Sequence, residues 1–219
     1  MLKRIYNKMF STYGPQHWWP GETPFEVIVG AILTQNTNWT NVEKAISNLK
    51  DRRLLSPDKL NKIKLSDLAD LIRPSGYFNI KSNRLKSFIL FLYNEFDGHL
   101  DRMFSLDLKK LRHMLLEVKG IGPETADSIL LYAGNYPVFV VDAYTKRIFS
   151  RIGILEEKHT YHQIQDFFMQ NLDNDVKLFN EYHALIVRHA KAFCRTKPAC
   201  QSCPLLNMPC SYGMKNNAR

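Results

Sequence analysis

The chain has 219 residues, of which 45% are hydrophobic and 12% aromatic, enough to bury one large core or two modest ones. Thirty Lys and Arg residues against 21 Asp and Glu give a net charge of +9, which favours a polyanionic partner such as nucleic acid. No run of about 18 apolar residues is present, and the opening MLKRIYNKMFSTYG lacks the apolar core and cleavage site of a signal peptide. We therefore expect a soluble, cytoplasmic protein with no membrane partner.

Helical periodicity dominates the chain. Apolar residues recur at helical spacing between Phe25 and Leu33 and again between Leu85 and Leu92. Proline and glycine mark the breaks between helices, at Pro20–Pro24, Ser56-Pro57, Pro74–Gly76, Gly120–Pro123 and Gly134–Pro137. Strand signals are nearly absent, so the sequence predicts an all-α protein of about nine to eleven helices.

A tight turn between two helices is predicted within LLEVKGIGPETADSILLYAG, residues 115–134. Gly120 and Gly122 permit positive φ and leave backbone N–H groups uncovered, while Ile121 between them anchors the turn in the core. Pro123 suits the first position of a helix, and a helix N-terminus favours an anion. The run Lys119-Gly120-Ile121-Gly122 is therefore a candidate site for a DNA phosphate, and a plain glycine-containing helix connection is the alternative.

A carboxylate follows this turn and its second helix. The apolar run Val138–Val141 leads directly into Asp142, which predicts a carboxylate that is partly desolvated and rigidly held. Asp142 also stands where it would cap a helix over residues 143–150. The two roles, catalytic group and helix cap, are compatible.

Together these motifs resemble the helix-hairpin-helix DNA glycosylase superfamily, the relatives of endonuclease III. The family pattern Leu-Pro-Gly-Val-Gly-x-Lys-Thr-Ala followed by Val-Asp is similar to residues 118–126 and then Val141-Asp142. Residues 33–37 (LTQNT) and 75–81 (SGYFNIK) resemble two further family segments. The resemblance implies that Gln35 fills the gap left by an extruded nucleotide and that Tyr77 wedges into the base stack.

The same resemblance implies a domain organisation. A six-helix barrel would span residues 24–137 and contain the hairpin, and a second helical domain would combine residues 1–23 with 138–219. Double-stranded DNA with a damaged base would lie in the cleft between them, and the protein would act as a monomer in base-excision DNA repair.

Glu124 departs from the pattern of endonuclease III proper. Those enzymes have a lysine two residues after the second hairpin glycine, and that amine attacks the sugar to form a Schiff base. A glutamate cannot do so, which predicts a monofunctional hydrolase in which Asp142 stabilises the oxocarbenium-like sugar and orients water. The alternatives are a bifunctional glycosylase/lyase acting on oxidised pyrimidines and a non-catalytic hairpin module.

Trp18, Trp19 and Trp39 are the three tryptophans of the chain and flank the first long helical segment. Their rings could sandwich a flipped base and would favour a cationic one, such as 3-methyladenine. Together with Glu124 they resemble the bacterial 3-methyladenine glycosylase branch of the superfamily. Packing of the amino-terminal arm is the alternative role, and oxidised pyrimidines, uracil or mismatched thymine are the alternative substrates.

All four cysteines, Cys194, Cys200, Cys203 and Cys210, lie in one short segment. A reducing cytosol favours metal ligation over disulfides, and four thiolates at this spacing can hold a [4Fe–4S] cluster or a zinc ion. The superfamily resemblance favours iron–sulfur, although this chain shifts one residue from the first cysteine interval to the last. The cluster would fix a loop that carries Arg195 and Lys197 to DNA phosphates.

Overall fold

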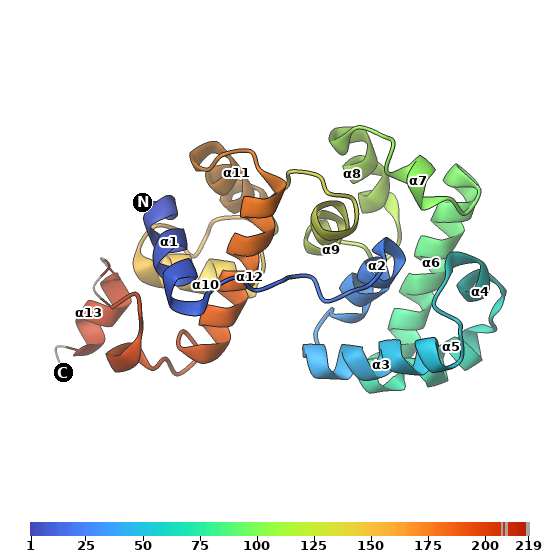
Figure 1. Ribbon diagram of the computed structural model, residues 1–219, viewed down its shortest axis with the longest axis horizontal. Coiled ribbons are helices and arrows are strands. Elements are labelled where there is room, and N and C mark those ends of the chain that lie inside the picture. Colours follow the sequence, from blue (N-terminus) through green and yellow to red (C-terminus); the bar gives the residue numbers. More distant parts are fainter. Residues whose placement is uncertain (207, 209, 218–219) are drawn as a thin grey trace. The chain divides into compact units, whose positions relative to one another are not determined.

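The computed structural model describes residues 1–206, 208 and 210–217 (Figure 1). Every regular element within these residues is helical, which confirms the all-α prediction. The chain forms two compact units, which we describe separately: unit 1 comprises Met1–Trp18 and Pro137–Arg219, and unit 2 comprises Trp19–Tyr136. The predicted domain boundaries lay nearby, at residues 23/24 and 137/138. No helix within the described ranges is long and apolar enough to cross a membrane.

The helices of unit 2 are α2 (Pro24–Leu33), α3 (Trp39–Asp51), α4 (Pro57–Lys62), α5 (Leu65–Leu71), η1 (Arg73–Ser75), α6 (Phe78–Phe96), α7 (Leu100–Met103), α8 (Leu108–Glu117), α9 (Pro123–Ser128) and the π-helical turn η2 (Ile129–Ala133). Helix α2 lies at the centre, with every residue from Phe25 to Leu33 buried. It packs against α3, α6, α9 and η2. Thr23 fixes its start, because the Thr23 side chain accepts a hydrogen bond from Glu26 N and Pro24 occupies the first turn.

Unit 1 contains α1 (Leu2–Tyr13), α10 (Ala143–Ile152), α11 (Tyr161–Asn171), α12 (Val176–Ala192), η3 (Cys200–Ser202) and α13 (Ser211–Asn217). Helix α12 packs against α1 and α10. Stacked and edge-on rings fill the core, with the Phe139 and Phe168 centroids 4.1 Å apart. The buried hydroxyl of Tyr182 on α12 donates to the Leu2 carbonyl at 2.9 Å and so ties α1 to this core.

The described residues include thirteen α-helical segments, more than periodicity indicated. The additional ones are short. Helix α7 has four residues and α4 has six, too few to show a repeating apolar face. The start of α4 is marked by its cap instead, because the Ser56 side chain accepts a hydrogen bond from Lys59 N.

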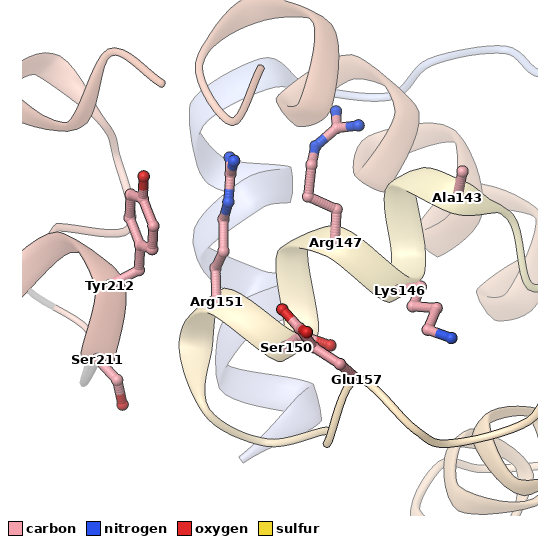
Figure 2. A pocket seen from close by; sticks show the side chains of 8 residues that line it. All are labelled: Ala143, Lys146, Arg147, Ser150, Arg151, Glu157, Ser211 and Tyr212. Atoms are coloured by element: carbon pink, nitrogen blue, oxygen red, sulfur yellow. The ribbon is translucent and has the colours of Figure 1, made fainter. Parts of the chain in front are cut away.

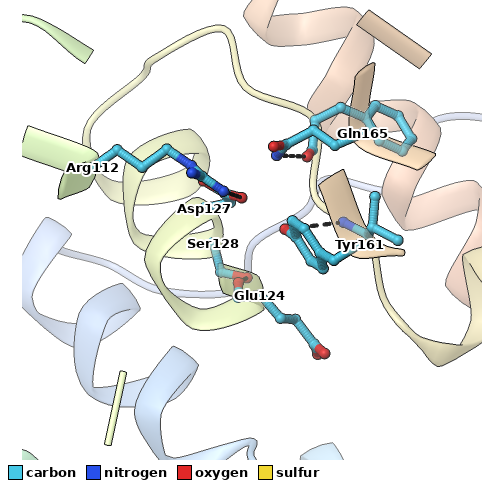
Figure 3. A network of polar contacts seen from close by, with 8 residues as sticks. Arg112, Glu124, Asp127, Ser128, Tyr161 and Gln165 are labelled. Atoms are coloured by element: carbon cyan, nitrogen blue, oxygen red, sulfur yellow. Dashed lines mark hydrogen bonds and ion pairs between the residues drawn. The ribbon is translucent and has the colours of Figure 1, made fainter. Parts of the chain in front are cut away.

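A buried ion pair joins the two helices that flank the hairpin. Arg112 of α8 donates from Nε to Asp127 Oδ1 at 2.7 Å and from Nη2 to Oδ2 at 3.0 Å (Figure 3). Asp127 of α9 has no exposed side-chain surface. Because breaking one side of a buried pair leaves an uncompensated charge, this contact holds α8 and α9 at a fixed relative position.

A buried lysine connects two turns of unit 2. Lys81 of α6 is 1% exposed, and its Nζ donates to the carbonyls of Leu33 at 2.8 Å and Ser75 at 2.6 Å. Leu33 is the last residue of α2, and Ser75 ends η1. Burial, assisted by the nearby charge of Arg84, lowers the pKa of Lys81 from its ordinary value of 10.5 to about 8.

This lowered pKa predicts a pH dependence of stability. Between about pH 8 and 10.5 the unfolded chain holds a proton on Lys81 that the folded chain has released, so the free energy of unfolding rises with pH in this window. We expect the free energy of unfolding to rise less steeply with pH in Lys81→Met than in the wild type. Lys44→Met, at an exposed position of α3, should keep the wild-type slope. Urea unfolding at pH 7.5, 8.5 and 9.5 measures the slope. Equal slopes in the wild type and Lys81→Met would contradict the prediction.

Candidate functional site

The predicted hairpin links α8 and α9. Gly120 adopts φ of 91°, in the left-handed region, whereas Gly122 has extended backbone (φ −95°, ψ 179°) that any residue adopts. The expectation that both glycines serve a positive-φ turn therefore holds for Gly120 alone. Ile121 is 4% exposed and anchors the turn as predicted, and its N–H bonds the Val118 carbonyl at 3.0 Å. Lys119 is exposed, and a Cβ added at Gly122 would meet nothing within 4 Å.

Gln35 lies against this hairpin. It follows α2, and its Nε2 donates to the Gly120 carbonyl at 3.1 Å and to Thr125 Oγ1 at 2.8 Å. Arg84 Nη1 donates to Gln35 Oε1. Arg84 also covers Gly120, since a Cβ added there would lie 2.9 Å from Arg84 Cδ. The structure thus joins two predicted site elements, Gln35 and the hairpin, through Arg84, a residue that sequence reasoning missed.

Tyr77 stands at the start of α6 and is 66% exposed. Its φ of 46° is unusual for a non-glycine residue, and it follows Gly76, which also has positive φ. A strained backbone that presents a large aromatic ring to solvent is typical of a functional position. Lys81 links the neighbouring turns by binding the carbonyls of Leu33 and Ser75, two residues before Gln35 and Tyr77, respectively.

Asp142 is the N-cap of α10, as the helix-cap prediction required. Its Oδ1 accepts from Thr145 N at 2.7 Å and from Thr145 Oγ1 at 2.8 Å. Its Oδ2 lies 3.5 Å from Nε2 of His183, a buried residue of α12. Burial alone would raise the pKa of Asp142, but the charge and hydrogen bond of His183, together with the Thr145 bonds, lower it on balance. The carboxyl group is therefore held in its ionised form.

The segment that leads into Asp142 is fixed from α11 (Figure 3). Gln165 Nε2 donates to the Phe139 carbonyl at 2.7 Å, and the Tyr161 hydroxyl accepts from Val141 N at 3.4 Å. These bonds satisfy backbone groups of a buried stretch that belongs to no helix. The apolar run of residues 138–141 is thus an extended segment whose polar groups are met by side chains.

Two of the three tryptophans meet in unit 2. Trp19 and Trp39 are edge-to-face with centroids 5.2 Å apart, and Tyr132 lies 5.1 Å from Trp19. A cavity of about 570 Å³ adjoins them and is lined by Trp19, Pro20, Gly21, Glu22, Glu26, Trp39, Glu43, Ile46, Ser47 and Lys50. Trp39 Nε1 donates to Glu43 Oε1 at 2.6 Å. The lining does not include Trp18, which belongs to unit 1, or Glu124, an exposed residue of α9.

The four cysteines surround one small cavity in unit 1, of about 30 Å³. Apolar side chains form most of the remaining wall, including Ile148, Ile152, Phe193 and Leu205. Burial raises the pKa of the Cys203 thiol to about 11, so a cation among the sulfurs is needed to hold this group as a thiolate at neutral pH. Four sulfurs in an apolar pocket are a donor set that suits iron or zinc.

Helix α10 holds the cysteine loop through two arginines. Arg147 Nε donates to the Cys194 carbonyl at 2.9 Å, and Arg151 donates to the carbonyls of Arg195 at 2.6 Å and Thr196 at 3.1 Å. The side chains of Arg195 and Lys197 are exposed. Sequence reasoning did not identify these α10 residues, because neither arginine belongs to a recognisable motif.

Unit 1 also has a cavity of about 730 Å³, larger than the one at the cysteines, which runs along α10 (Figure 2). Its wall is formed by Ala143, Lys146, Arg147, Ser150, Arg151, Glu157, Ser211 and Tyr212. The Arg151 guanidinium lies over the Tyr212 ring at 4.8 Å. Three cations against one carboxylate make this groove positive, and it begins one residue after Asp142.

A hairpin with a single left-handed glycine, and a capping carboxylate on a later helix of an all-α chain, define the helix-hairpin-helix class of DNA repair proteins. The family model for HhH-GPD superfamily base excision DNA repair proteins matches residues 29–174. The chain belongs to this superfamily, and it is a base-excision DNA glycosylase, an enzyme that acts on bases in DNA.

Similar proteins agree with this assignment. The chain is 49% identical over 207 residues to a Methanocaldococcus jannaschii protein described as a candidate DNA repair glycosylase, covering 94% of each chain. Among solved structures, a 3-methyladenine DNA glycosylase of Helicobacter pylori bound to 1,N6-ethenoadenine is 30% identical, with a TM-score of 0.76 over 87% of this chain and 97% of that one. An endonuclease III in complex with DNA shares the fold, with 20% identity and a TM-score of 0.84 over 100% of this chain and 99% of that one.

The two hairpin glycines make a matched pair for mutation. Gly120→Ala should cost about 1–3 kcal/mol of unfolding free energy, because alanine is strained at this φ and its Cβ would collide with Arg84. Gly122→Ala should cost less than about 1 kcal/mol, since its backbone is extended and the space beside it is open. Chemical denaturation of both variants measures the difference. Equal losses would show that the left-handed turn at Gly120 is not the constraint we describe.

Proposed function

We propose that the protein is a monofunctional glycosylase that hydrolyses the N-glycosidic bond of alkylated purines such as 3-methyladenine. One pair of observations carries this proposal: Asp142 is held as a carboxylate, and Glu124 occupies the position where a lyase would have an amine. Glu124 cannot form a Schiff base, so an abasic site with an intact strand is the expected product.

The hairpin supplies the main grip on double-stranded DNA. The open face beside Gly122 and the start of α9 would accept a phosphate, with Lys119 exposed alongside. Gln35 is already held by Gly120, Thr125 and Arg84, so little conformational entropy is lost when it enters the space of an extruded nucleotide. Tyr77 would insert beside it, since its ring projects into solvent.

The basic surface of unit 1 would extend this grip. Lys146, Arg147 and Arg151 line the α10 groove, and Arg195 and Lys197 are exposed on the adjoining cysteine loop. Phosphate binding by such side chains is independent of sequence and weakens as salt rises. These groups would therefore add affinity for any duplex, whereas the choice of base would depend on the pocket.

Asp142 would act on the sugar. Departure of the base leaves positive charge on the ribose ring, and an ionised carboxylate nearby lowers the free energy of that state. Its lowered pKa makes Asp142 a weak base, so the work is mainly electrostatic, with some orientation of the attacking water. No lysine needs to take part.

The aromatic residues favour a cationic base. Trp19 and Trp39 lie in a cavity wall with three carboxylates, Glu22, Glu26 and Glu43, against the single cation Lys50, which pairs with Glu22 and Glu26. The wall is therefore negative on balance and attracts a positively charged ring. Trp18 and Glu124 remain predicted members of the base pocket. An alkylated purine carries positive charge and leaves without prior protonation, which suits a site with one catalytic carboxylate.

A [4Fe–4S] cluster is the cofactor we propose for the cysteine cavity. Cys194, Cys200, Cys203 and Cys210 surround a cavity with a largely apolar wall, and the superfamily resemblance favours iron–sulfur over zinc there. When bound, the cluster would cross-link the loop and hold Arg195 and Lys197 in place.

Asp142→Asn tests the catalytic role. Asparagine still caps α10, so folding and DNA affinity should persist while release of 3-methyladenine falls by about a hundredfold or more. Asp173→Asn removes an exposed carboxylate of the same unit and should leave release unchanged. Single-turnover release from alkylated duplex measures the rate. Wild-type release by Asp142→Asn would overturn the assignment of Asp142.

A second test separates the reaction types. We expect release of alkylated purines from a panel of alkylated, oxidised, uracil-containing and mismatched duplexes, with no nicked strand and no adduct after borohydride treatment. A trapped adduct with oxidised pyrimidine would favour a glycosylase/lyase. Release of uracil or mismatched thymine instead of alkylated purines would show that the proposed substrate class is wrong. Salt-sensitive binding without any release would favour a non-catalytic module.

The cofactor proposal predicts colour. The purified protein should be brown, with absorbance near about 400 nm from thiolate-bound iron–sulfur. Cys203→Ser should lose the colour and the iron, whereas Ser202→Ala, at the exposed neighbouring position, should keep both. Metal analysis that finds one zinc and no iron in the colourless wild type would contradict the cluster.

A further inference from the structure

The two carboxylate oxygens of Asp142 have different surroundings. Thr145 takes both of its hydrogen bonds to Oδ1, one from the backbone and one from the hydroxyl. Oδ2 faces His183 Nε2 at 3.5 Å. The Asp142 and His183 side chains are 11% and 7% exposed, so water contributes little to holding either group.

A buried carboxylate without partners would take up a proton. Both Thr145 bonds go to Oδ1, so the satisfaction of Oδ2 and of its share of the charge depends on another group. His183 comes from the middle of α12, which packs against α10. It is therefore held by a rigid element on the side of Oδ2.

We propose that His183 is a positioning residue for the catalytic carboxylate, which it holds from the side of Oδ2. The proposal rests on the catalytic role of Asp142 given above. His183 Nε2 faces Oδ2 and can donate to it in either protonation state, provided that the neutral ring carries its hydrogen there.

Other polar groups around Asp142 are engaged elsewhere. On α11, the Tyr161 hydroxyl accepts from Val141 N. On α10, Lys146 is exposed and donates from Nζ to the His159 carbonyl at 3.2 Å. His183 thus remains the partner of Oδ2 among the contacts that the structure shows.

Removing His183 changes the balance that sets the pKa of Asp142. Burial is the largest single influence and raises this pKa, while the charge and hydrogen bond of His183 oppose it more than the Thr145 bonds do. An apolar substitute therefore moves the pKa of Asp142 upward. The acid limb of the pH–rate profile should shift to higher pH with it, because only the ionised carboxylate stabilises the sugar cation.

The experiment compares His183→Leu and His183→Gln in the full-length, metal-loaded protein. Single-turnover release of 3-methyladenine is measured from pH 5 to 8.5. For His183→Leu we expect a loss of about tenfold to a hundredfold near pH 6, partial recovery at higher pH and unchanged DNA affinity. His183→Gln retains an N–H donor and should lie near the wild type. His162→Leu, at an exposed histidine of α11, is the control.

The outcomes separate the two proposals. If Asp142→Asn releases the base like the wild type, both the catalytic role of Asp142 and the positioning role of His183 are contradicted. If Asp142→Asn is inactive but His183→Leu keeps the wild-type acid limb, with at most a uniform loss of rate, His183 serves packing alone. If His183→Leu does not fold, His183→Ala and His183→Asn, which also remove the ring nitrogen beside Oδ2, replace it. An acid limb unshifted in both variants would overturn the proposal.

Discussion

Unit 1 is organised around the capped N-terminus of α10. Burying the Asp142 carboxylate is costly, and Thr145, His183 and the start of the helix together offset that cost. The same helix carries Arg147 and Arg151, which bind carbonyls of the cysteine loop. One helix therefore connects the proposed catalytic group to the proposed cluster, and a shift of α10 would disturb both. This explains why so much polar bonding is concentrated on it.

In unit 2, a buried ammonium group fixes the turns that carry the residues proposed to enter DNA. Lys81 binds carbonyls in two turns, just before Gln35 and just before Tyr77. Arg84, one turn further along α6, binds Gln35 and covers Gly120. The groups proposed to enter DNA are thus fixed by α6 before any DNA is present. Preorganisation of this kind reduces the entropy that binding must overcome.

The features that could be predicted from the sequence are those that depend on residues close together along the chain. Helices follow from local periodicity, the hairpin from two glycines and a proline, and the cysteine cavity from four cysteines clustered in the sequence. His183 and Arg84 could not be found this way, because each meets its partner across a long stretch of chain and belongs to no local pattern. The extended backbone of Gly122 shows a related limit, since glycine permits positive φ but does not require it.

The chemistry proposed for Asp142 and the proposed substrate class depend on one another. Hydrogen bonds that fix a carboxylate also lower its basicity, so Asp142 is better suited to stabilising a cation than to removing a proton. Such a site can act only on a base that departs readily. A cationic purine does so without an acid catalyst, and the aromatic and acidic wall formed by Trp19, Trp39 and Glu43 attracts that charge. A neutral base would need a proton donor opposite the carboxylate, which is the chemical requirement that distinguishes the alternative substrates from the proposed one.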